Sequence, residues 1–280
     1  MKGLKKIALV SAVALAPFAA NADLKALNDS DMSSVTGQAG VTIDLSANVS
    51  IAEIAYQDQG FLAISGVSLA GQNGTDLDNI RLTIDVAGDG SDLGNTAMAS
   101  AYLGGTVGTD VAVDEGDLVI SLRSQDGAPV DFNLGIDSVS LAGSGGTFGS
   151  LAGSGTVLVS DLSLDGLIGP TDIVVDGSSN NVNINAFFSA GGNIDLPFIG
   201  TSFTLALGNS RGAGVGPFAH VQADVGVAQN VNGDDVLSVN VTDFSADVDL
   251  IDINTGGTAN IGSLYMTDLV VTADMKIYGH

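Results

Sequence analysis

The chain lacks cysteine and tryptophan, and aromatic residues make up only 5% of its 280 positions. Without cysteine it can form no disulfide, and it offers no thiolate for a zinc or iron–sulfur site. Its two histidines, His220 and His280, lie in no recognisable ligand or catalytic motif. A core must therefore be built from valine, isoleucine, leucine and alanine. The hydrophobic content of 45% argues against a disordered chain.

Basic residues are also scarce, with eight Lys and Arg against 32 Asp and Glu and a formal net charge of −24. A surface this negative repels nucleic acid, so we expect no nucleic-acid partner. All the acidic residues lie after residue 22, and nearly all are Asp, which favours turns over strands. Because Asp carboxylates are common Ca²⁺ ligands, the composition favours a cation-rich setting outside the cytoplasm.

The first 22 residues have the pattern of a cleavable secretion signal. Three lysines precede an apolar run over residues 7–18, and Ala20-Asn21-Ala22 fits the recognition pattern of signal peptidase. The apolar run is shorter than the roughly 20 residues that a spanning helix needs. We therefore expect a mature chain that begins at Asp23, has no integral membrane span, and is extracellular or at the cell surface. The periplasm is the alternative location.

Apolar and polar residues alternate over long stretches after residue 40, as in β-strands with one apolar side. The longest strict alternation runs from Val41 to Ile51 and predicts a half-buried strand. A second pattern, apolar-x-apolar-x-x-apolar-x-apolar, recurs five times and slips by one residue in its middle. A β-bulge at each slip would keep both halves of the strand on one face. The slips fall at Ser65-Gly66, Asp137-Ser138, Ser160-Asp161, Thr242-Asp243 and Thr267-Asp268.

These patterns predict one all-β domain over residues 41–280, preceded by a short helix and linker motif in residues 23–40. We expect an elongated antiparallel sheet, a sandwich or a β-roll with bulged strands. Turns rich in Gly, Asp and Asn should separate the strands, as at Asp126-Gly127 and Asp165-Gly166, and residues 143–155 should form a loop within the domain. An outer-membrane β-barrel is the structural alternative, although the chain lacks the aromatic girdles of such barrels.

No catalytic constellation stands out in the sequence. No nucleophile elbow or nucleotide-binding fingerprint occurs, and acidic pairs are too numerous to single out one, so we expect no enzyme. The best candidate site is a Ca²⁺ site at a Gly-rich turn, although its spacing does not match an EF-hand. Its ligands would be Asp85, Asp89 and Asp92, with Asp76 and Asp78 close in sequence.

Residues 27–43 read LNDSDMSSVTGQAGVTI. This segment resembles the start of a group of exported Gram-negative proteins that open with L-x-D-x-x-[LM]-S-x-V-[TS]-G-Q-x-G-[IV]-T-[IV]. The group includes FilA-like pilus-assembly proteins. The resemblance implies an envelope or surface protein connected with filaments, and it brings no catalytic residues.

The sequence and the resemblance together favour an exported structural or adhesive protein, associated with filaments, pili or a biofilm matrix and stabilised by Ca²⁺. Such a protein would associate with itself or with other surface proteins, since long alternating strands offer edges for strand addition. The alternative function is a soluble envelope protein that binds an apolar ligand, such as a lipid, in a β groove.

Overall fold

The computed structural model describes residues 40–88, 113–211 and 217–279. The chain divides into two units, residues 1–39 and 40–280, and the structure below is that of the second unit. The helix and linker motif expected in residues 23–40 therefore lie, apart from Gly40, outside the described residues, as do Asp89 and Asp92.

The described chain is all-β, as the alternation predicts, and its strands form one antiparallel sheet. A 3₁₀ turn, η2 (Gln72–Gly74), separates the third and fourth strands. The strands are β1 (Val41–Ala47), β2 (Val49–Gln57), β3 (Phe61–Ala70), β4 (Leu77–Val86), β5 (Leu118–Ser124), β6 (Val130–Ala142), β7 (Thr156–Asp176), β8 (Asn181–Leu196), β9 (Thr201–Gly208), β10 (Ala219–Gln229), β11 (Asp235–Asn254) and β12 (Gly262–Ile277).

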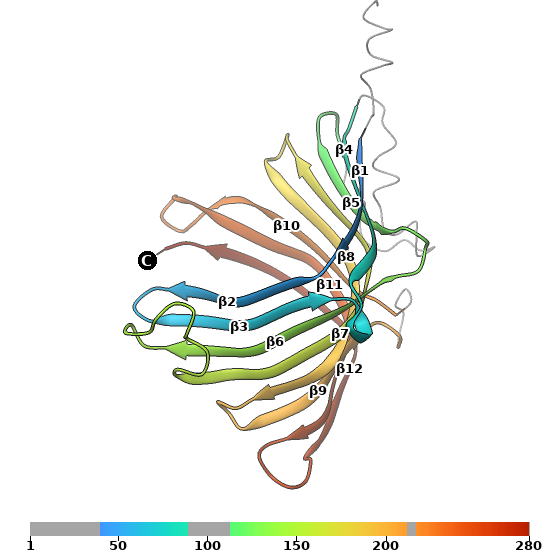
Figure 1. Ribbon diagram of the computed structural model, residues 1–280. Coiled ribbons are helices and arrows are strands. Elements are labelled where there is room, and N and C mark those ends of the chain that lie inside the picture. Colours follow the sequence, from blue (N-terminus) through green and yellow to red (C-terminus); the bar gives the residue numbers. More distant parts are fainter. Residues whose placement is uncertain (1–39, 89–112, 212–216, 280) are drawn as a thin grey trace, which may run out of the picture. The chain divides into compact units, whose positions relative to one another are not determined.

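The sheet has two arms, which share the long strands β7, β8, β11 and β12 (Figure 1). The first arm has the strand order β1-β4-β5-β7-β8-β10-β11-β12, and the second has the order β2-β3-β6-β7-β8-β9-β11-β12. Each arm is thus eight strands wide, and the chain crosses between the arms as a simple antiparallel meander. The sheet does not close into a barrel, because β1, β2 and β12 each pair on one side only within the described chain.

A hydrophobic cluster fills the bend where the two arms meet. Its buried members are Leu77 and Ile80 of the first arm and Val130 of the second. Partly buried residues of β3, β5, β6 and β7 pack around these three side chains. In β7 the register shifts across Gly169-Pro170, where proline cannot donate a ladder hydrogen bond. The arms are therefore joined by a small core at the bend.

Most of the predicted slips are confirmed as irregularities of the sheet. At Thr242-Asp243 the register of β11 shifts against both β10 and β12. At Asp137-Ser138 the strand keeps its register with β3, and a shift against β7 follows between Val139 and Ser140. Three slips are absorbed by residues in the left-handed backbone region, namely Gly66 (φ 65°), Asp161 (φ 48°) and Asp268 (φ 54°).

The turn predicted at Asp165-Gly166 is wrong, because both residues lie inside β7. A Cβ atom at Gly166 would clash with the carbonyl oxygen of Ser189 and with the ring of Phe132. Glycine therefore serves close packing at this position and does not form a turn. The turn at Asp126-Gly127 and the loop over residues 143–155 are both present.

The strand predicted from Val41 to Ile51 is present, with an interruption at Asn48. Its apolar side, however, is not buried as we expected. The exposed fractions are 54% for Val41, 40% for Ile43 and 38% for Ile51. Alternation identifies the apolar side of a strand, but it does not ensure that another part of the chain covers that side.

We expect the Gly66→Ala substitution to lower the free energy of unfolding by about 1–3 kcal/mol. Alanine resists the left-handed backbone at this position, and its Cβ atom would clash with the carboxylate of Asp137. Chemical denaturation of the chain over residues 23–280 measures the loss. Gly143→Ala is the matched control, since a Cβ atom there meets nothing within 4 Å. Equal losses in the two variants would contradict a special role for Gly66.

Candidate functional site

One face of the first arm is aliphatic across all its strands. Ile84, Ile120, Ile173 and Ile184 lie opposite one another on β4, β5, β7 and β8. A parallel row nearer the end of the arm crosses seven strands, and no member of either row is charged. This second row is Val86, Leu118, Val175, Val182, Val225, Val239 and Met275.

The second arm has a matching aliphatic face. The paired strands bring side chains of the same kind opposite one another from β2 to β12. The bulges described above keep both halves of β3 and β7 on this face, because each absorbs one residue of slip. The longest row is Val49, Leu69, Leu134, Leu164, Gly192, Leu205, Leu250 and Leu264.

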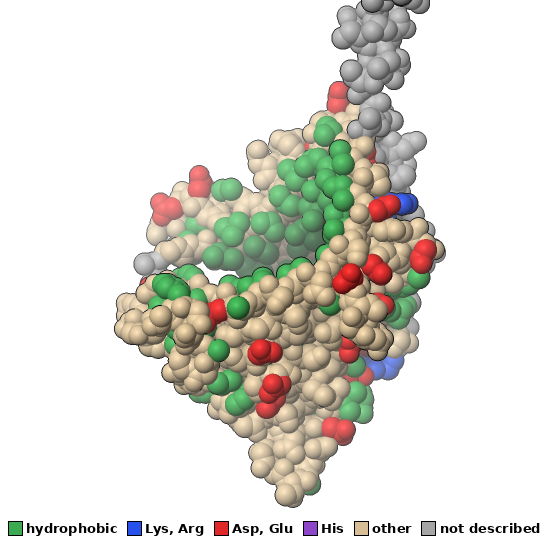
Figure 2. Space-filling view, viewed as in Figure 1, with side chains coloured by type: hydrophobic (Ala, Val, Ile, Leu, Met, Phe, Trp, Pro, Cys, Tyr) green, Lys and Arg blue, Asp and Glu red, His purple; other side chains and the backbone are tan. Residues whose placement is uncertain are grey.

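The apolar faces of the arms line a hollow, which Figure 2 shows as a continuous hydrophobic lining between the arms. The arms are joined through the core at the bend and diverge from it. The described residues leave much of the lining accessible, and large exposed side chains include Val175 of the first arm and Leu62 of the second. A large exposed apolar surface is typical of a site that binds a ligand, another protein or a membrane.

The outer face of the sheet carries the charged side chains, and arginines join its strands. It also holds three small buried hydrophobic clusters, around Leu151, Val174 and Phe187. Arg81 contacts Asp44 at 2.7 Å across β4 and β1, and this hydrogen bond lowers the pKa of the Asp44 carboxyl. Arg123 contacts the buried Asp172 at 2.8 Å across β5 and β7. These pairs join neighbouring strands and leave the lining of the hollow free of charge.

His220 also belongs to this outer face and is 1% exposed. Its ring nitrogens lie 2.8 Å from an Asp243 oxygen and 2.6 Å from the Asn185 side-chain oxygen. The ring stacks on Phe187 with centroids 4.5 Å apart. A ring packed and hydrogen-bonded on both sides is an element of structure, and it offers no open position to a substrate.

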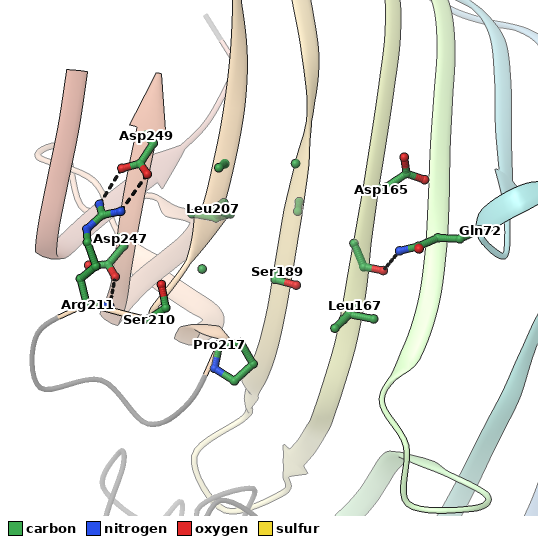
Figure 3. A pocket seen from close by; sticks show the side chains of 15 residues that line it. Gln72, Asp165, Leu167, Ser189, Leu207, Ser210, Arg211, Pro217, Asp247 and Asp249 are labelled. Atoms are coloured by element: carbon green, nitrogen blue, oxygen red, sulfur yellow. Dashed lines mark hydrogen bonds and ion pairs between the residues drawn. The ribbon is translucent and has the colours of Figure 1, made fainter. Parts of the chain in front are cut away.

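A second candidate site is an outer pocket of about 400 Å³ near Arg211 (Figure 3). Its lining includes small residues, such as Gly191 and Ala206, and the polar side chains of Asp249 and Gln72. The Arg211 guanidinium makes two hydrogen bonds to Asp249, at 2.6 and 2.8 Å, and reaches further acceptors on β12. Since the charged groups here satisfy one another, the pocket is a weaker candidate than the hollow.

Asp247 fixes the backbone beside this pocket. Its carboxylate accepts hydrogen bonds from the backbone N–H groups of Arg211 and Asp268. Burial raises the pKa of Asp247, but these donors and the nearby Arg211 charge together bring it below its ordinary value. The Asp247 side chain is only 4% exposed. However, the strands form a single sheet, so few atoms lie beyond its immediate neighbours. Burial therefore raises the pKa by less than the two donors and the Arg211 charge together lower it.

The predicted Ca²⁺ ligands are only partly described. Asp85 lies near the end of β4, whereas Asp76 precedes the strand and Asp78 lies at its start. Asn79, next to Asp78, has left-handed backbone (φ 59°). Six residues of extended strand then separate Asn79 from Asp85 by about 20 Å, at about 3.3 Å per residue. Asp76 and Asp78 therefore cannot share one ion with Asp85. In the part of the chain that the structure describes, no three carboxylate or imidazole groups converge to hold a metal.

The sequence raised an apolar β groove as the alternative function but identified none of the residues that line the hollow, although their signal was present. The same alternation that predicts strands recurs in segment after segment, with Val, Ile and Leu on one side. Every strand has an apolar side, and the sequence offers few aromatic residues and no second layer to pack against it. This combination indicates an apolar face that no other part of the sheet covers. Only the strand order shows that these sides form one continuous surface.

Comparisons with known proteins give little further direction. Residues 1–88, which extend through β4, match the model of DUF6160, a family of unknown function. No curated protein matches the chain, and no solved structure matches it. Among the described residues, none forms a helix with the length and apolar character that crossing a membrane requires.

We expect Asp247→Asn to lower stability more at neutral pH than in acid. A carboxylate with a lowered pKa stabilises the folded state above its unfolded pKa of about 3.9, and this contribution is lost as the pH falls through the folded pKa. Urea denaturation at about pH 7 and about pH 3 should show the difference between wild type and variant shrinking in acid. A difference of the same size at both pH values would contradict the charge-based role.

The Ca²⁺ site stays a prediction, and it has a direct test. If Asp85 and Asp89 bind the ion, millimolar Ca²⁺ should raise the melting temperature more than NaCl at matched ionic strength. The Asp85→Asn/Asp89→Asn variant should lose the excess, whereas Asp58→Asn, on the turn after β2, should keep it. Equal shifts with the two salts would show that ions act on this acidic chain only by screening.

Proposed function

We propose that this chain holds elongated aliphatic molecules, the acyl chains of amphiphilic lipids, in the hollow between its arms. The observation that carries the proposal is the largely aliphatic lining, which crosses the strands of both arms and remains accessible. This was the alternative function that the sequence raised, and the geometry favours it over the others.

The chemistry of the lining supports a flexible hydrocarbon ligand. The rows described above consist of Val, Ile, Leu and Met, with Gly192 among them. Such side chains bind by area and shape, and each buried CH₂ group of a ligand contributes about 0.8 kcal/mol. A long acyl chain can thus gain substantial affinity without any specific polar contact.

The shape and charge of the surface favour a single bound amphiphile over a bilayer. A flat membrane surface cannot reach the floor of a concave hollow, and two hollows placed face to face would enclose empty space. The net charge of −24 also disfavours anionic headgroups near the rim. We therefore infer that the preferred ligands have zwitterionic or neutral headgroups.

A structural or adhesive role at the cell surface remains a second candidate. The feature that favours it is the pair of open sheet edges formed by β1–β2 and by β12. The two functions are compatible, because the edges and the hollow are different surfaces.

Titration of the delipidated mature chain with a fluorescent zwitterionic lysophospholipid tests the proposed function. We expect saturable binding that Val175→Asp and Leu62→Asp each weaken about tenfold or more, equivalent to about 1.4 kcal/mol. Each variant places a charge on the lining of one arm, at side chains that are 38% and 37% exposed.

Val231→Asp and Phe198→Asp serve as matched controls, because both residues are exposed in turns away from the aliphatic rows. They should bind the probe as the wild type does, and circular dichroism should show all four variants folded. Absence of binding, or an equal loss in controls and lining variants, would refute the proposal. Binding to zwitterionic vesicles without capture of the monomeric probe would indicate membrane adsorption instead.

A further inference from the structure

We propose that copies of this chain join head to tail, with β12 of one copy pairing in antiparallel fashion with the β1–β2 edge of the next. This inference goes beyond the proposed ligand binding and does not rest on it. The occupant of each open edge is thus the opposite edge of a second copy.

Both edges of the sheet are long and unpaired within the described chain. The first edge is β1 followed by β2, which pair only with β4 and β3, and it spans residues 41–57. The second edge is β12, which pairs only with β11 and spans residues 262–277. Each edge therefore presents a row of free backbone donors and acceptors of nearly the same length.

The two edges run in opposite directions. β1 begins at the outer end of the first arm, where Val41 pairs with Ile84, and β2 ends at the outer end of the second arm. β12 begins in the second arm and ends in the first, where Ile277 pairs with Leu237. If the next copy lies beside β12 in the way that each strand lies beside its neighbour, its β1–β2 edge therefore runs antiparallel to β12. Neighbouring strands are antiparallel throughout the sheet.

The bends of the two edges also correspond. The first edge is interrupted at Asn48, and β12 has left-handed backbone at Asp268. Aligning these two positions sets a register for the seam between copies. In that register aliphatic side chains meet aliphatic side chains, which is a favourable cross-strand pairing. The pairs are Val41 with Met275, Ile43 with Ala273, and Leu45 with Val271.

The features that usually prevent strand addition are sparse on both edges, although β12 carries Lys276 and each edge has one irregular position, Asn48 or Asp268. Both lack proline, and their charged side chains are few. Asp44 is paired with Arg81, and Glu53 accepts backbone hydrogen bonds from Gly149 and Leu151. Seven of the large exposed hydrophobic residues lie on the first edge and six on β12.

A contact between two different edges is heterologous, so it can repeat from copy to copy. The net charge of −24 opposes such growth at low ionic strength. Assembly should therefore increase as added salt screens the repulsion. In an assembly of this kind the aliphatic rows of successive copies would continue across each seam.

Two edge-blocked variants of the mature chain test the proposal by sedimentation velocity at increasing NaCl. Ile43→Lys blocks the first edge and Val271→Lys blocks β12, and both side chains are 40% exposed in the isolated chain. We expect the wild type to form long oligomers and each variant alone to remain monomeric. An equal mixture of the two should form dimers and nothing larger, because one good edge of each kind remains.

The matched control is Val231→Lys, in the turn after β10, which should assemble as the wild type does. Circular dichroism should show that every variant is folded. A wild type that stays monomeric at all salt concentrations would overturn the proposal. Dimers of either blocked variant alone would also overturn it, since they require pairing of two identical edges.

Discussion

The architecture depends on one constraint: each strand must keep its aliphatic side chains on the face that lines the hollow along its whole length. A one-residue slip in the alternation would turn half of a strand over and place serine and aspartate in the hollow. Gly66 and Asp161 prevent this on neighbouring parts of the second arm, because their left-handed backbone absorbs the extra residue. The hollow is therefore a consequence of backbone conformation at a few positions as much as of apolar composition.

The polar face completes this division of the sheet. Arg81, Arg123 and Arg211 each contact an Asp on a nearby strand, and these pairs lie on the outer side. An exposed ion pair such as Arg81–Asp44 contributes at most about 1 kcal/mol, and for the Arg123 pair the cost of burying Asp172 offsets much of the attraction, so these pairs cannot replace a second layer. They instead favour one register of strand pairing, since a register shift would separate each arginine from its Asp partner. The stability of the sheet then rests mainly on strand pairing, on the core at the bend and on the smaller buried clusters of the outer face.

Much of this fold could be predicted from sequence because period-two alternation and its slips are local features. The bulge at Asp161 follows from spacing alone, whereas the role of Gly166 depends on the ring of Phe132, a contact between different strands. For the candidate Ca²⁺ ligands, closeness in sequence is misleading. Asp78 and Asp85 lie at opposite ends of β4, so they are far apart in space. Predicting the hollow requires the strand order, because that order joins short apolar segments into one surface.

An uncovered apolar face leaves much of the hydrophobic contribution of this sheet unrealised. Any molecule that binds the folded chain and not the unfolded one stabilises it, so an occupant of the hollow and a neighbour at an edge would each raise stability by mass action. The ligand would bind in the hollow and the neighbouring copy at an edge. The same rows of side chains take part in both contacts, because the rows that line the hollow end at the edges. A ligand longer than one hollow would contact two joined copies. Its binding and their association would then reinforce each other by the same free energy, because linkage is reciprocal.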